Sequence, residues 1–276
     1  MNKSLKSNVY CTNLDGNWKN AVKRVLDNSN LNEKLSNDTK NSVLLKPNLV
    51  EASPPPITTS LELVKNTFFW IRENFPDKKV IIGEGCGSIS YETDYVFEKL
   101  GFAKFAKENN IELIDLNYAK TIVKKIDSCT RWTEMHLPEI IYNSFLISMP
   151  VLKAHSMADV TLSMKNMLGC APPKFYCSGS WKKSAFHNNL QEAIFELNLY
   201  RKADFIIMDA SVGMSQAHLW GPTCNPPVNK IIASDDTVAI DAFATELLGK
   251  DWKKIKHIKM ADKILGNAES KNIILV

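Results

Sequence analysis

Short apolar runs alternate along the chain with longer stretches in which apolar residues recur at helical spacing. The apolar runs predict strands at 43–46, 79–83, 111–116, 145–149, 203–208 and 230–233. The helical periodicity predicts helices at 61–75, 94–109, 161–168, 187–200, 237–248 and 253–265. Continuous apolar strands separated by helices are typical of a parallel sheet buried on both faces. The pattern therefore predicts an α/β fold with a mostly parallel sheet covered by helices on both faces.

The remaining segments are polar or aperiodic. We expect a surface helix and a loop at 13–41, and a half-exposed strand at 121–126. Residues 169–184 and 213–227 combine glycine, proline, cysteine and aromatic residues without periodicity, which is typical of long functional loops. No linker-like segment divides the chain, so we predict one domain over residues 1–276.

Composition excludes several classes of protein. Of the 276 residues, 45% are hydrophobic and 23% are charged, an ordinary balance for a globular domain. The net charge of +4 is spread along the chain, which disfavours a nucleic-acid interface. No apolar stretch is long enough for a membrane span, and six cysteines are too few for a disulfide scaffold. We therefore expect a cytoplasmic protein that binds neither nucleic acid nor membrane.

Polar residues follow the predicted strands where each strand ends. In a parallel sheet the carboxyl ends of the strands meet at one edge, and ligands of open α/β sheets bind there. Five predicted strands deliver polar residues to that position, and packing alone does not explain such a set. The residues are Lys46 and Asn48, Glu84, Lys153 and His155, Asp209, and Asp235.

The densest polar cluster contains Lys153, His155, Lys165 and Asn166. A lysine that directly follows a buried strand is poorly solvated unless it meets an anion. We therefore expect Lys153 and Lys165, together with Lys46, to bind a carboxylate or phosphate. A surface loop with one hydrogen-bonded histidine remains the alternative.

The proton-transfer groups that we predict are His155, His187 and Lys165. Asn48, Glu84, Asn166, Asp209 and Asp235 are the polar residues expected to contact the substrate or to orient these groups.

Three glycines lie in the six residues from Gly83 to Ser88. Glycines at the end of a strand allow the backbone to approach a ligand closely, and they also suit a plain tight turn. The spacing matches neither the dinucleotide-binding fingerprint nor a P-loop.

Four cysteines, Cys86, Cys170, Cys177 and Cys224, lie in loops that we assign to the same edge. Thiolates converging from separate loops would hold an iron–sulfur cluster or another soft metal. Their spacing shows no CxxC pair, so four unrelated small residues remain the alternative.

The order of these motifs resembles domain-of-unknown-function family 362. The resemblance covers about residues 43–266 and rests on Lys46-Pro-Asn48, Gly83-Glu84-Gly, Lys153-Ala-His155, Thr161-x-x-x-Lys165-Asn166, Asp209, Gly221-Pro222 and Ser234-Asp235. It implies an association with iron–sulfur proteins. This chain has no ferredoxin-type cysteine run, so electrons would come from a separate ferredoxin-like donor.

A more distant similarity connects the early strand, the glycine turn and the histidine-bearing segment with the N-terminal domain of the lactate racemase family. That family uses a nickel pincer cofactor to move a hydride on 2-hydroxy acids. The similarity favours an enzyme over a scaffold.

Three functional hypotheses follow. The first is an enzyme acting on a small anionic metabolite, with an oxidoreductase that uses an iron–sulfur cluster or soft metal as the favoured form. The second is a non-catalytic carrier that delivers a metal, cluster or cofactor. The third is a metal-independent isomerase or hydrolase, although the chain lacks the Gly-x-Ser-x-Gly motif of serine hydrolases.

Overall fold

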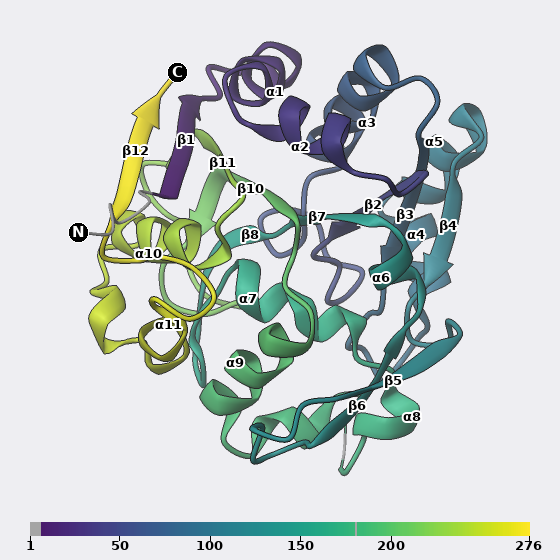
Figure 1. Cartoon of the computed structure of the whole chain (residues 1–276). Coiled ribbons are helices and arrows are strands. Elements are labelled where there is room, and N and C mark those ends of the chain that lie inside the picture. The colour runs from purple at the N-terminus through teal and green to yellow at the C-terminus, as the bar shows by residue number, and fades with distance from the viewer. Residues whose placement is uncertain (1–6, 180) are drawn as a thin grey trace.

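A large, mostly parallel sheet runs through the molecule (Figure 1). The computed structural model describes residues 7–179 and 181–276. The strands follow the order β12-β1-β11-β10-β7-β2-β3-β4, and β8 and β9 extend the sheet from β10. Their bounds are β1 Ser7–Asn13, β2 Ser42–Pro47, β3 Lys79–Glu84, β4 Glu112–Asp115, β7 Phe145–Met149, β8 Val151–His155, β9 Asp159–Thr161, β10 Phe205–Met214, β11 Lys230–Ser234 and β12 Lys271–Leu275.

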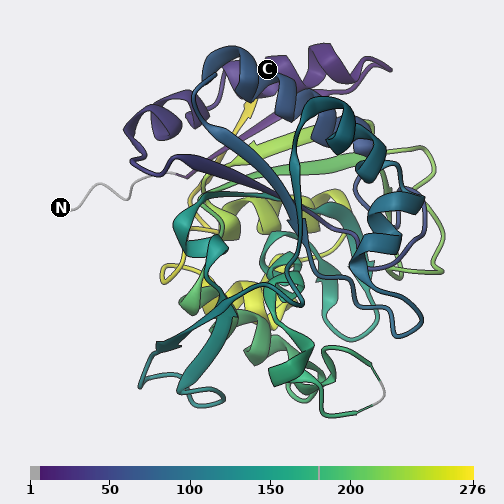
Figure 2. The same cartoon turned by 90° about the vertical axis from the view of Figure 1, so that its right-hand side faces the viewer.

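Helices cover both faces of this sheet, as the sequence predicts (Figure 2). Successive side chains of a strand point to opposite faces. Val43 and Leu45 of β2 therefore pack in one hydrophobic core, while Leu44 packs in the other. The Val43 side is covered by α1 (Trp18–Asp27), α2 (Leu31–Asn37), α3 (Leu61–Asn74), α4 (Thr93–Lys99) and α5 (Phe102–Asn109). The Leu44 side is covered by α7 (Ser163–Asn166), α9 (Leu190–Tyr200), α10 (Thr237–Leu247) and α11 (Lys256–Ala261).

A two-stranded antiparallel sheet stands apart from the main sheet. It pairs β5 (Thr121–Lys125) with β6 (Glu134–Pro138). The predicted half-exposed strand is thus correct. The remaining short elements are α6 (Ile140–Asn143), α8 (Pro173–Tyr176) and the 3₁₀ turns η1 (Met167–Cys170), η2 (Ser184–His187) and η3 (Trp252–Lys254).

β9 runs antiparallel to β8, and β11 is the antiparallel strand within the series from β12 to β4. β11 runs antiparallel to both β10 and β1, whereas β10, β7, β2, β3 and β4 are parallel. The carboxyl end of β11 therefore lies at the opposite edge from the other strand ends. Asp235 follows β11 and pairs there with Lys34 at 2.8 Å, so its predicted place in the site is wrong.

Other elements also differ from the expectation. The predicted helix at 94–109 is two helices, because Gly101 adopts a left-handed conformation with φ 83° between α4 and α5. Thr161 ends β9, so the helix predicted at 161–168 begins only at Ser163 and continues as the 3₁₀ turn η1. The predicted last helix is shorter, and β1, β8, β9 and β12 were not predicted. None of the helices in the described part of the chain has the length and apolar character that crossing a bilayer requires.

Candidate functional site

A cavity of about 470 Å³ opens beyond the carboxyl ends of β2, β3 and β8. Segments far apart in the sequence line it, including the loops after β2 and β3, helix α7 and the segment around η2. The predicted site residues that line it are Asn48, Glu84, Lys153, His155, Lys165, Asn166 and His187. Most of the predicted site residues therefore lie together at one cavity, as their positions at the ends of strands predict.

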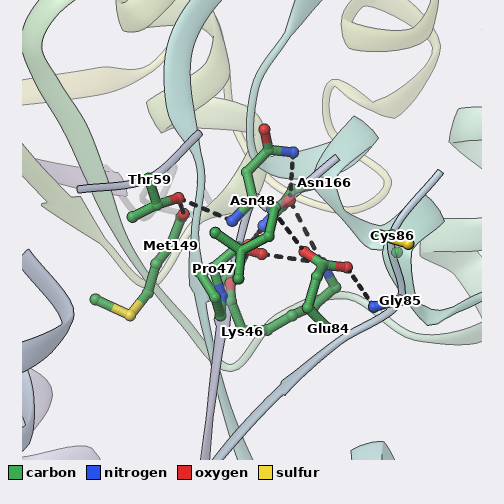
Figure 3. Close-up of polar contacts among 12 residues, drawn as sticks. Lys46, Pro47, Asn48, Thr59, Glu84, Gly85, Cys86, Met149 and Asn166 are labelled. Atoms are coloured by element: carbon green, nitrogen blue, oxygen red, sulfur yellow. Dashed lines mark hydrogen bonds and ion pairs between the residues drawn. The ribbon is translucent and has the colours of Figure 1, made fainter. Parts of the chain in front are cut away.

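Lys46 and Glu84 form a buried ion pair beside this cavity (Figure 3). Lys46 Nζ lies 2.9 and 3.1 Å from the two carboxylate oxygens of Glu84. Glu84 also accepts hydrogen bonds from the backbone N–H groups of Leu49 and Gly85. Glu84 already neutralises the charge of Lys46. We therefore assign to the Lys46 ammonium the role of holding Glu84 in place beside the cavity, and not that of binding the anion.

Two asparagines connect this pair to Lys153. Asn48 Nδ2 donates to Asn166 Oδ1 at 3.0 Å, and Lys153 Nζ donates to Asn48 Oδ1 at 2.7 Å. Lys153 also donates to the carbonyl of Ile57 at 2.5 Å. Both acceptors of Lys153 are neutral, so no ion pair in the described residues balances its buried charge, although Glu51 and Glu84 act on it from a distance. Burial lowers the pKa of Lys153 to about 7, and the positive charge of Lys165 adds to the effect.

Lys165 lies on α7 and reaches the same cavity. Its ammonium has no hydrogen bond or ion pair with any residue that the structure describes. Burial lowers the pKa of Lys165 to about 8. The charge of Lys165 also lowers the pKa of His155, His187 and His218, so these groups surround it closely enough to interact.

Lys183 is a third cavity lysine, which the sequence analysis did not single out. Its Nζ donates to the carbonyls of Gly85 at 2.8 Å and Gly169 at 3.1 Å. Burial lowers the pKa of Lys183 to about 8. The sequence placed it in a functional loop but could not distinguish it from Lys182, which pairs with Glu92 instead.

His155 is held in one tautomer. Its Nδ1 accepts hydrogen bonds from the backbone N–H groups of Met157 at 3.0 Å and Ala158 at 3.1 Å. Nδ1 therefore carries no proton, and the neutral ring is protonated at Nε2. Burial lowers the pKa of His155, which keeps the ring neutral and available as a hydrogen-bond donor. His218 stacks on it with 3.9 Å between ring centroids, a contact that the sequence analysis missed.

His187 has two contacts at Nδ1. Trp181 Nε1, which can only donate, lies 3.2 Å from His187 Nδ1. The carbonyl oxygen of Lys183, which can only accept, lies 3.3 Å from the same nitrogen, so these contacts do not select one tautomer of the ring. Burial also lowers the pKa of His187.

The glycine turn after β3 is a close-packing device. The N–H groups of Gly85, Cys86 and Gly87 donate to acceptors within the protein, so they are not free to bind an anion. A Cβ on Gly85 would lie 2.4 Å from Asn117 Oδ1 and 2.5 Å from the carbonyl oxygen of Gly169. The glycines therefore allow this turn and the η1 segment to approach each other beside the cavity.

Asp209 does not line the cavity. Its carboxylate accepts hydrogen bonds from the N–H of Ser60 at 2.9 Å and from the hydroxyl of Ser211 at 2.6 Å. Because Ser60 caps α3, Asp209 connects the start of this helix to β10.

The predicted cysteine site is not formed. Among residues 7–179 and 181–276, no three His, Cys, Asp or Glu side chains are grouped so that they could hold a metal ion. Cys86 packs in the core on the α3 side of the sheet, and Cys170 packs in the core on the α9 side. Cys177 is exposed, and Cys224 lies in a loop beside Gly213. Burial raises the pKa of Cys170 to about 11, which disfavours the thiolate that binds metals.

The fold and the cavity together define the class of protein. It is an α/β protein with a lysine-rich cavity at the carboxyl edge of a mostly parallel sheet. The chain belongs to the family described as Domain of unknown function (DUF362), whose model matches residues 43–246. The family resemblance read from the motifs is thereby confirmed.

Similar proteins include one matched by sequence and one matched by structure. The Thylakoid-associated protein sll1697 of Synechocystis sp. is 29% identical over 121 residues, which make up 43% of this chain and 37% of that protein. The lactate racemase apoprotein from Thermoanaerobacterium thermosaccharolyticum superposes with a TM-score of 0.53 and 14% identity. That match covers 84% of this chain and 55% of the racemase chain. The chain thus spans about a third of one relative and about half of the other, and the second likeness concerns the fold.

Proposed function

We propose that this protein is an enzyme that binds a small anionic metabolite in the lysine-rich cavity and transfers a proton to or from it. One observation carries the proposal. Lys153, Lys165 and Lys183 line one cavity, and none of them forms an ion pair with a carboxylate in the described residues.

The energetic argument concerns buried charge. Removing an ammonium from water costs several kcal/mol unless an opposite charge is near. The Lys46–Glu84 pair meets this condition. Among the described residues the buried Lys153 and Lys183 have only neutral acceptors, and the half-buried Lys165 has none. A bound carboxylate or phosphate would supply the missing charge and raise the lysine pKa values again.

The site also offers acid–base chemistry. A lysine with a pKa near 8 exchanges its proton readily at neutral pH, and no residue in the described part of the chain holds the Lys165 ammonium in place. We assign proton transfer to Lys165. His155 presents an Nε2–H group, which suits it to donate a hydrogen bond to the anion, and His187 lines the same cavity.

An iron–sulfur cluster or a soft metal held only by protein side chains does not fit the residues present, whereas the nickel pincer cofactor, which supplies its own metal ligands, stays a prediction. The described residues offer no set of three metal-binding side chains, so no step is derived through a metal. A redox reaction and the ferredoxin-like electron donor, both implied by the family resemblance, stay predictions. Elemental analysis and a visible spectrum of anaerobically purified protein test them.

A ligand screen tests the proposed function. Carboxylates, phosphate esters and 2-hydroxy acids, lactate included, are added to the full chain, and the melting temperature is followed. A ligand at about 100 times its dissociation constant stabilises the folded state by roughly 2.7 kcal/mol. Compounds that bind are then assayed for turnover and for exchange of carbon-bound protons with solvent.

The outcomes separate the hypotheses. Stabilisation with turnover supports the enzyme, and stabilisation without any turnover supports the carrier alternative. If no anion stabilises the protein, the proposed function is wrong.

A further inference from the structure

We infer that the natural ligand carries at least two negative charges, as a phosphorylated or dicarboxylate compound does. This inference rests on the proposed function and narrows its substrate class.

Charge balance is the first argument. Glu84 is the carboxylate that lines the cavity, and Lys46 already neutralises it at 2.9 Å. Glu51, whose charge also acts on Lys153, forms no ion pair with it in the described chain and accepts a hydrogen bond from Ser53. The three cavity lysines therefore leave an uncompensated positive charge that a monoanion neutralises only in part.

The lysines are arranged so that one ligand can reach several of them. Lys153 belongs to β8, Lys165 to α7 and Lys183 to the segment before η2, yet all three line the same cavity. Lys153 and Lys183 each donate two hydrogen bonds to carbonyl oxygens. Because an ammonium has three N–H groups, each keeps one donor for a ligand.

Further donors face the same space. Thr161 lines the cavity, is 4% exposed, and its Oγ1 has no hydrogen-bond partner in the described residues. The tautomer of His155 places a proton on Nε2, and this N–H has no hydrogen-bond acceptor among residues 7–179 and 181–276. Buried polar groups are normally satisfied, so an acceptor-rich ligand is expected to bind them.

The size of the cavity agrees with this ligand class. At about 470 Å³ it falls within the range of roughly 300–1,000 Å³ that holds drug-sized ligands. A three-carbon monoacid would leave much of this volume unfilled, whereas a ligand with two separated acidic groups would span more of it.

Titration calorimetry on the full chain tests the inference with matched pairs of compounds. Succinate is compared with butyrate, and 3-phosphoglycerate with glycerate. We expect the more highly charged member of at least one pair to bind about tenfold more tightly or better, because its second negative charge meets a cavity lysine that the monoanion leaves uncompensated. Repeating the titration at about pH 8 in buffers of different ionisation enthalpy should show proton uptake, because a bound anion raises lysine pKa values.

Variants locate the effect. Lys165→Met and Lys183→Met should each remove most of the preference for the more charged compound. Lys174→Met, at an exposed position in the same region of the chain, should retain it. Circular dichroism confirms that each variant is folded, and Lys165→Met is the safer variant because the Lys165 ammonium has no partner among the described residues.

Two results are decisive and distinguishable. If both members of each pair bind equally, or the monoanions bind more tightly, the inference about charge is overturned while the proposed function stands. If none of the four compounds binds and the wider anion screen also fails, the proposed function itself is overturned.

Discussion

Lys46 and Lys165 are both lysines beside one cavity, but their partners differ. Lys46 is fully buried and paired with Glu84, whereas Lys165 has no partner in the described chain. We expect Lys165→Met to lose anion affinity while the free energy of unfolding stays the same or rises, because no protein contact is lost. Lys46→Met should instead destabilise the protein by about 3–5 kcal/mol, since Glu84 is left buried and unpaired. Chemical denaturation of the two variants measures this, and similar losses in both would contradict it.

The lowered pKa of Lys153 predicts a pH dependence of stability. In the unfolded chain Lys153 titrates near 10.5, and in the folded protein near 7. Between these values the unfolded state binds more protons, so this group makes the free energy of unfolding rise with pH by up to about 1.4 kcal/mol per pH unit. Below about pH 7 both states are protonated and the contribution is constant.

The matched comparison is between the wild type and Lys153→Met from pH 7 to pH 9. Subtracting the two curves removes the contributions of the tyrosines, the cysteines and Asp241, which also titrate differently in the two states. We expect the stability of the wild type to rise relative to that of the variant across this range. A constant difference would show that Lys153 titrates normally.

Several site residues could be predicted from the sequence because the end of an apolar run marks the end of a buried strand. Apolar runs precede Asn48, Lys153 and His155, and Asn166 lies on the same short helix as Lys165. All of these residues line the cavity. Lys183 could not be predicted, since its contacts with Gly85 and Gly169 depend on how two loops pack. The prediction of a cysteine metal site was wrong for the same reason. The position of a residue in a loop does not determine the direction of its side chain.

At the scale of elements, two neighbouring helices, α9 and α10, hold helix α7 in position. The carboxylate of Asp241 on α10 accepts hydrogen bonds from the N–H groups of Ser163 at 2.8 Å and Met164 at 2.9 Å. Asn198 of α9 donates to the carbonyl of Met164 at 2.9 Å. A helix of four residues is too short to be stable alone, so these contacts fix the place of Lys165.

Asp241→Asn should therefore weaken anion binding without touching the ligand. The amide has one acceptor oxygen, so one of the two N–H groups loses its bond. We expect roughly tenfold weaker binding and faster hydrogen exchange at Ser163 and Met164. Glu246→Gln, on the exposed side of the same helix, is the control. Unchanged exchange at both amides would contradict this role.

Element types were easier to predict than element limits. The apolar run at 145–149 is β7, but the chain continues after Pro150 into β8, which carries Lys153 and His155. The direction of β11 could not be predicted from the sequence, because antiparallel and parallel strands can have the same apolar pattern. That single reversal moved Asp235 away from the site.

At the scale of the whole molecule, strands outside the family match complete the sheet. The matched region is 43–246, yet β1 and β12 form one side of the sheet and pair with each other in parallel. Thr12 Oγ1 and the carbonyl of Cys11 bond to Val276 at 2.6 and 3.0 Å.

Deleting residues 270–276 should lower the melting temperature but leave anion affinity within about twofold, because distant sites are largely independent. Thermal unfolding and calorimetry of the truncated chain measure both quantities. Loss of anion binding in a truncated protein that is still folded would contradict the expected independence.

The place of the C-terminus has a practical consequence for immobilisation. Val276 follows β12, which forms one side of the sheet (Figure 1). The loops after β2 and β3 line the cavity, and β2 is five strands away from β12. With about 4.8 Å between neighbouring strands, β12 and β2 are separated by roughly 24 Å across the sheet. A bead or sensor surface tethered at the C-terminus would therefore leave the cavity open to a mixture of metabolites passed over it.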